Sequence, residues 1–151
     1  MSEDQVLLAK VFARVAEDLA FMFTESPDEE LDEPAGNAFA KAHMSFHGPF
    51  SGTLSVAVPE SMCAQIASNV LGLDPGDELF IQQPYDALKE LLNVTCGNLL
   101  TAMAGEEPVF DLQPPEVTVL DRAGWDAFKD SPGTVPFIVE DEPVLLSLQR
   151  G

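Results

Sequence analysis

The hydrophobic residues of this chain follow two different periods, and the change between them limits the folds open to it. Between Asp4 and Thr24 apolar residues recur at steps of three and four, which is typical of an amphipathic helix. From Phe39 to Val58 they alternate with other residues, as in strands with one buried face, and a Gly-Pro pair at 48–49 supplies a hairpin turn. Such a chain must pack a helix against a sheet.

The same order returns in the second half of the chain. Helical spacing predicts a short second helix over 59–71 and a longer third helix from Pro84 to Gly105. Strand-like segments follow at 109–112, 116–121, 135–140 and 144–149, with Trp125 in a short helix between them. We therefore predict an α+β fold, a mainly antiparallel sheet with about three helices, as a pseudo-repeat of helix, strand and strand. Residues 1–151 form a single domain in this prediction, and the acidic, proline-containing segment 25–36 is a loop.

Charge and cysteine usage narrow the partners and the compartment. The chain has 26 acidic and 7 basic residues, a net charge of -19, and no Lys/Arg cluster that could neutralise several phosphates. We therefore expect neither nucleic acid nor an anionic membrane as a partner. No signal-like segment and no apolar run of membrane-spanning length is present, and Cys63 and Cys96 both lie in apolar helical segments. These features favour a reduced, cytoplasmic compartment.

Four residues of the third helix share one face. At about 100° per residue, with Asp86 at zero, Glu90 lies near 40°, Asn93 near 340° and Gly97 near 20°. The apolar residues fall between about 140° and 260°, so this face should point outward. We call Asp86, Glu90, Asn93 and Gly97 the motif stripe.

A plain solvated surface accounts for only half of the motif stripe. Asp86 and Glu90 suit the first turns of any helix, because carboxylates there favour the helix dipole. Asn93 and Gly97 do not, since Asn is a weak helix former and Gly costs about 1 kcal/mol relative to Ala inside a helix. The pattern therefore favours close approach of a partner to this helix.

The segment Asp86-Ala-Leu-Lys-Glu90-Leu-Leu-Asn93-Val-Thr-Cys-Gly97 resembles the D-x-x-x-E-x-x-N helix of the CheC/CheX/FliY phosphatases of bacterial chemotaxis. Those proteins hydrolyse the aspartyl phosphate of CheY. The rest of the chain resembles the family loosely, and Pro114 and Pro115 fall near a downstream proline of the family pattern without matching its register.

The resemblance implies a role for each residue of the motif stripe. The Asn93 carboxamide would hold a water in line with the phosphorus, and Glu90 would pair with the active-site lysine of the receiver. Gly97 would leave room for a partner loop, and Asp86 would lie at the partner-binding face. An amide suits this task because a carboxylate would be repelled by the phosphoryl oxygens. The Mg²⁺ would belong to the receiver, and this chain would need no cofactor and no metal site of its own.

The first helix lacks the same set. If the two halves correspond, Glu17 matches Glu90, but Ala20 stands where Asn93 would be. This single-site arrangement resembles CheX rather than CheC, and it implies a homodimer. An alternative hypothesis is a non-catalytic module of the same fold that binds a receiver or a flagellar-switch component.

Other candidate sites find little support. His43 and His47 would lie about 13 Å apart along a strand, too far to share one metal ion. The segment from Asp74 to Glu78 lacks the alternating ligands of a calcium loop and is predicted to be a turn. Both cysteines are predicted to be packed and inert, because no base or resolving cysteine is near in sequence.

Overall fold

The residues that the structure describes form a seven-stranded sheet at the centre of the protein. The computed structural model describes residues 2–25, 33–34 and 36–151. Strand order is β1-β6-β7-β3-β2, and both β4 and β5 lie beside β2; every pairing is antiparallel. The strands are β1 (Thr24–Glu25), β2 (Phe39–His47), β3 (Gly52–Pro59), β4 (Asp111–Leu112), β5 (Glu116–Leu120), β6 (Thr134–Val139) and β7 (Glu142–Arg150). The predicted acidic loop falls mostly outside the described residues, and Glu25, its first residue, belongs to β1.

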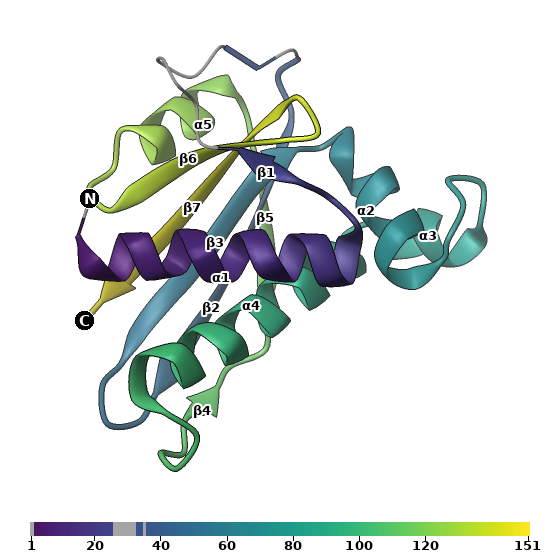
Figure 1. Ribbon diagram of the computed structural model, residues 1–151. Helices are drawn as coiled ribbons and strands as arrows, with labels where there is room; N and C mark the ends of the chain where they lie inside the picture. Colours follow the sequence, from purple (N-terminus) through teal and green to yellow (C-terminus); the bar gives the residue numbers. More distant parts are fainter. Residues whose placement is uncertain (1, 26–32, 35) are drawn as a thin grey trace.

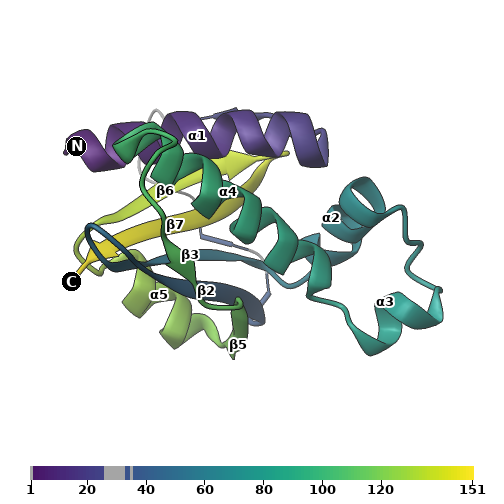
Figure 2. The same ribbon diagram turned by 90° about the horizontal axis from the view of Figure 1, so that it is seen from below.

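Helices lie on both faces of this sheet (Figures 1 and 2). They are α1 (Glu3–Ala20), α2 (Met62–Leu71), α3 (Glu78–Gln82), α4 (Asp86–Ala104) and α5 (Arg122–Lys129). The main core lies between the sheet and α1, α2 and α4. A smaller core lies on the other face, where Trp125 of α5 stacks on Phe39 with ring centroids 4.6 Å apart. The predicted α+β class is confirmed. The described residues hold five helices: α5 is the short helix predicted around Trp125, and α3 is too short to show a clear period in the sequence.

The helix α1 begins at a capping box and ends earlier than its hydrophobic pattern predicts. The Ser2 hydroxyl accepts a hydrogen bond from the Gln5 backbone N–H at 3.1 Å, and the Ser2 N–H donates to the Gln5 side chain at 2.8 Å. Phe21 takes a left-handed conformation, φ 56°, which stops the helix. The predicted extension to Thr24 is therefore wrong, and Phe23, which continues the apolar pattern in the sequence, is 66% exposed.

The segment between α2 and α4 stands away from the rest of the molecule (Figures 1 and 2). Gly72, at φ 69°, ends α2. The predicted turn near Asp74 is present, since the Asp77 carboxylate accepts from the Asp74 N–H at 2.7 Å and the Asp77 N–H donates back to the Asp74 carbonyl at 3.0 Å. The helix α3 that follows was not predicted from the sequence. It leads directly into α4, the helix that carries the motif stripe.

Candidate functional site

The helix α4 packs on the sheet along a broad apolar arc. Its buried residues are Ala87, Leu88, Leu91, Leu92, Thr95, Cys96, Leu99 and Leu100. The Thr95 hydroxyl is satisfied inside this arc, because it donates to the Leu91 carbonyl at 2.7 Å. Cys96 lies near 280° on the same helical wheel, outside the predicted apolar range of 140–260°, yet it is 0% exposed. The buried arc is therefore wider than the sequence predicted, and it leaves only a narrow outward band.

The motif stripe occupies this outward band. Glu90 and Asn93 are exposed, and Asp86 and Gly97 are partly exposed. Within the described part of the chain, no hydrogen bond or ion pair engages the side chains of Asp86, Glu90 or Asn93. Two carboxylates and one amide thus lie on adjacent turns with their polar atoms available to another molecule.

Gly97 has no packing reason to be glycine. A Cβ built at this position meets no atom within 4 Å, whereas one at Gly48 would come within 2.6 Å of the Phe110 ring. The helix therefore carries the propensity cost of Gly97 without an internal benefit. The remaining explanation for a glycine at this position is that another molecule approaches the helix closely here.

A shallow groove runs beside the motif stripe, between α1 and α4. It has a volume of about 280 Å³ and is lined by Arg14, Val15, Asp18, Leu19, Val94 and Asn98. Asn98 differs from Asn93, because its amide donates to the Val94 carbonyl at 2.8 Å. The helix thus holds one asparagine that is bonded to its own backbone and one that is not.

The start of α4 is tied to the turn that follows β3. The Tyr85 hydroxyl donates to the Glu60 carboxylate at 3.0 Å, and burial together with this bond raises the pKa of Tyr85 to about 12. Burial and the nearby Glu60 charge also raise the pKa of Cys63 to about 12, and burial raises the pKa of Cys96 to about 11. Both thiols therefore stay protonated at neutral pH. Sequence reasoning missed the link between Tyr85 and Glu60, because no local pattern pairs residues 25 positions apart.

The first helix presents no comparable stripe. Glu17 is exposed, but Ala20 is 0% exposed, and its carbonyl accepts a hydrogen bond from the Asn69 side chain at 2.8 Å. The position that would match Asn93 therefore faces the interior. An amide at this point of α1 would have no access to a partner.

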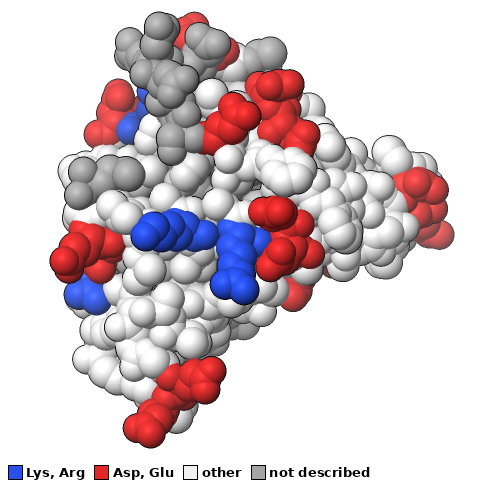
Figure 3. Space-filling view, viewed as in Figure 1, with Lys and Arg blue, Asp and Glu red and all other residues white. Residues whose placement is uncertain are grey.

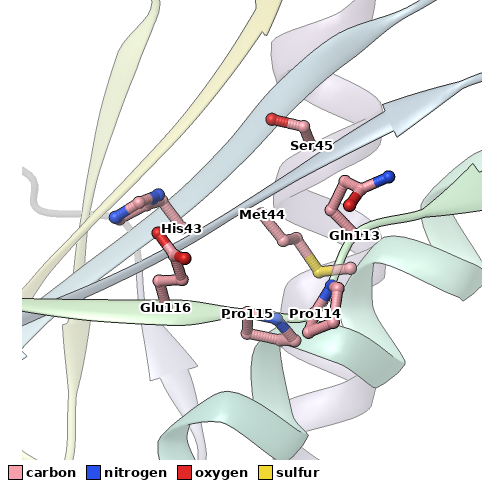
Figure 4. Close-up of a pocket in the computed structure, with 7 residues that line it drawn as sticks. All are labelled: His43, Met44, Ser45, Gln113, Pro114, Pro115 and Glu116. Carbon is pink, nitrogen blue, oxygen red and sulfur yellow. The ribbon is translucent and has the colours of Figure 1, made fainter.

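A larger cavity, of about 530 Å³, lies apart from the motif stripe, where the chain passes from β4 to β5 (Figure 4). Its lining residues are His43, Met44, Ser45, Gln113, Pro114, Pro115 and Glu116. His43 and Glu116 lie side by side on paired strands, and the two prolines occupy the break between β4 and β5. None of the motif stripe residues lines this cavity. Among the described residues, no group of three or more His, Cys, Asp or Glu side chains could hold a metal ion.

Acidic side chains are spread over the face shown in Figure 3, with a few basic ones grouped along α1. The basic residues of α1 are Lys10 and Arg14, and Arg14 pairs with Asp18 at 3.7 Å.

No helix in the described ranges has the length and apolar character needed to cross a bilayer.

Fold and site together define an α+β protein whose candidate site is an open helix face rather than an enclosed pocket. Residues 41–129 match a protein family described as "Chemotaxis phosphatase CheX", and the chain belongs to this family. The resemblance predicted from the α4 motif is thereby confirmed.

Solved structures agree with this assignment. The chemotaxis protein CheX of Desulfovibrio desulfuricans aligns with a TM-score of 0.72 at 16% identity, over 99% of this chain and 100% of that one. CheX of Vibrio vulnificus aligns with a TM-score of 0.69 at 16% identity, over 99% and 97%. CheX in the CheX-CheY-BeF3-Mg²⁺ complex of Borrelia burgdorferi aligns with a TM-score of 0.67 at 14% identity, over 96% of each chain. At these identities the structures show the shared fold. No curated protein matches the chain.

Proposed function

We propose that this protein accelerates hydrolysis of the aspartyl phosphate of a CheY-like response regulator. Asn93 positions the attacking water, and Glu90 docks against the active-site lysine of the receiver. The observation that carries this proposal is the pair itself: Glu90 and Asn93 lie one helical turn apart, exposed, and without internal partners in the described part of the chain. Membership of the CheX family and the Borrelia burgdorferi CheX complex with CheY support a receiver as the partner.

The proposed chemistry needs little from this protein. Water attacks the phosphorus, the bond between phosphorus and the aspartyl oxygen breaks, and inorganic phosphate and a free carboxylate result. The Asn93 carbonyl oxygen accepts a hydrogen bond from the water and orients it in line, which lowers the entropic part of the barrier. A neutral amide does this without adding charge beside the phosphoryl oxygens. The Mg²⁺ would be supplied by the receiver, as it is present in the Borrelia burgdorferi complex, and we propose no cofactor bound by this chain alone.

The test compares phosphate loss from a phosphorylated CheY-like receiver with and without the protein. We expect Asn93→Ala to lower the acceleration by roughly 100-fold, the scale of a lost positioning or proton-transfer group. Glu90→Ala should weaken receiver binding as well. Matched controls are Asn98→Ala, on the same helix but near 120° on the wheel where Asn93 is near 340°, and Glu17→Ala on α1; both should leave the acceleration within about twofold of wild type.

The outcomes separate the two candidate functions. Equal acceleration by wild type and Asn93→Ala would contradict the catalytic assignment. Receiver binding without any acceleration by the wild-type protein would instead support the non-catalytic docking module, since docking alone does not require an amide at position 93.

We also propose that residues 1–151 act as one domain, as a homodimer in the cytoplasm. The compartment follows from the proposed partner, and the two buried free thiols, Cys63 and Cys96, are compatible with reducing conditions. Fluorescent-fusion microscopy with a membrane marker would test the location, and signal confined to the cell envelope would contradict it.

A further inference from the structure

The segment that precedes the motif helix exposes apolar side chains without an evident structural reason. We call residues 72–83 the α3 arm. Its helix, α3, has no buried residue, and its two large aliphatic side chains, Leu79 and Ile81, are 57% and 65% exposed. Figures 1 and 2 show the arm standing apart from the body, next to the start of α4. Exposed aliphatic residues on a projecting element are typical of an interaction surface.

The arm is packed on its inner side and hydrogen-bonded within itself. Leu73 and Phe80 pack against the main core from the inner side of the arm, while Leu79 and Ile81, on either side of Phe80, face outward. Its internal hydrogen bonds include Asp74 N–H to the Asp77 carboxylate at 2.7 Å, the Gln82 amide to the Glu78 carboxylate at 3.1 Å, and Gln83 N–H to the Leu79 carbonyl at 2.9 Å. An element that is already ordered loses little conformational entropy when it binds.

The arm and the motif stripe lie within reach of one partner. Ile81 precedes Asp86 by five residues, and a chain of that length spans at most about 18 Å. Asp86 and Asn93 are seven residues apart in α4, which adds a rise of about 10 Å. A standard protein interface covers about 800 Å² per partner, a patch roughly 30 Å across. The two bounds add up to about 28 Å, so a receiver footprint centred between the arm and Asn93 can span both Asn93 and Ile81.

The charges around the arm indicate what the contacted surface must look like. Asp74, Asp77 and Glu78 precede the apolar side chains in the arm, and Figure 3 shows acidic residues at the tip of this projection with uncharged surface beside them. A complementary surface is apolar at its centre and carries Lys or Arg at its border.

We propose that the α3 arm is the second part of the receiver-docking surface. Leu79 and Ile81 contact an apolar patch, bordered by Lys or Arg, next to the phosphorylated pocket of the receiver, and so determine which receiver is accepted. This proposal rests on the proposed function. It adds a specificity element that lies outside the motif stripe and does not touch the phosphoryl group.

The experiment uses the double variant Leu79→Gln/Ile81→Gln in the full chain. Gln keeps helix propensity, and both positions are exposed, so the variant should fold with an unchanged melting temperature. The probe is the CheY-like receiver whose dephosphorylation the protein accelerates: loaded with BeF3 and Mg²⁺ for the Kd, and phosphorylated for kcat. The matched control is Val109→Gln, an 81% exposed aliphatic residue beyond the opposite end of α4. We expect the double variant to weaken the Kd by about tenfold or more while kcat at saturation stays within twofold of wild type, and the control to change neither.

Each other outcome overturns the proposal in a distinguishable way. An unchanged Kd for the double variant, together with loss of turnover in Asn93→Ala, removes the arm from the docking surface and leaves the proposed function intact. A change in the oligomeric state by light scattering, with unchanged receiver binding, assigns the arm to contact between copies of this chain. If no receiver is bound or dephosphorylated by wild type, the proposed function fails, and the role of the arm fails with it.

Discussion

Asn93 and Asn98 show how environment decides what one residue type can do. Both lie on the exposed part of α4, five residues apart. The Asn98 amide is engaged by the Val94 carbonyl, while the Asn93 amide has no partner among the described residues. Only the latter offers both its donor and its acceptor to a water held at a partner's active site.

The glycine at position 97 gives a prediction in which stability and activity move in opposite directions. Gly97→Ala should raise the free energy of unfolding by about 0.5–1 kcal/mol, because Ala is the better helix former. The added methyl group meets nothing inside the monomer. We expect slower receiver dephosphorylation from the same variant, because a partner approaching Gly97 would meet this methyl group. Urea unfolding and phosphate release measure the two effects, and a stabilised variant with unchanged turnover would show that no close approach occurs there.

Burial of Cys63 predicts how stability depends on alkaline pH. The pKa of this thiol is raised from 9.0 to about 12, first by burial and then by Glu60. Between these values the folded protein keeps a proton that the unfolded chain has lost. The stabilising contribution is therefore complete below pH 9 and falls as the pH rises toward 12. Each pH unit in this window corresponds to roughly 1.4 kcal/mol for one fully linked group.

The measurement is urea unfolding from pH 8 to pH 10.5 for wild type and Cys63→Ala. Cys96 and Tyr85 contribute with the same sign, so both proteins should lose stability as the pH rises. The free energy of unfolding should fall less steeply with pH in Cys63→Ala than in wild type. Parallel curves would mean that the Cys63 thiol titrates in the folded state as it does in the unfolded chain.

At the scale of elements, periodic patterns predicted long helices and strands well and their ends less well. The buried and exposed faces of α4 were predictable because the angle between successive helical residues is nearly constant. Residues spaced three or four apart in the sequence therefore lie on one face of the helix. The end of α1 was not, because Met22 and Phe23 continue the apolar rhythm although Phe21 leaves the helical region. The conformation of that one residue depends on its surroundings, which include the Asn69 contact to the Ala20 carbonyl.

The α3 arm shows a different limit of sequence reading. A helix of five residues is too short to display a period. The spacing of its apolar residues in the sequence therefore does not indicate which of them are buried. Of three consecutive apolar residues, only Phe80 packs inward. The exposure of Leu79 and Ile81 is a property of how the arm projects from the fold. This is why the sequence indicated the motif stripe but not the adjacent apolar surface.

At the scale of the whole molecule, the sheet has an edge that the described residues leave open. The strand β5 pairs only with β2 there, so its other side presents unpaired backbone groups. Val119 stands opposite Ala40 on the same face of the sheet, yet it is 56% exposed, whereas Ala40 is 0% exposed. An unpaired strand with an exposed aliphatic side chain is a surface onto which a second strand can add.

The proposed homodimer is expected to use this edge. A second copy that pairs its own β5 with this β5 would form hydrogen bonds with the unpaired backbone groups of the edge. It would also cover Val119 in both copies, because a twofold interface repeats every contact. Val119→Lys would place like charges opposite each other and should give a monomer in sedimentation velocity, while Val109→Lys, 81% exposed and outside β5, should stay dimeric. A monomeric wild type at micromolar concentration would contradict the dimer, and a dimeric Val119→Lys would move the interface to another surface. Since β5 lies beside β2 while the motif stripe lies on α4, loss of the dimer should leave dephosphorylation per protomer unchanged.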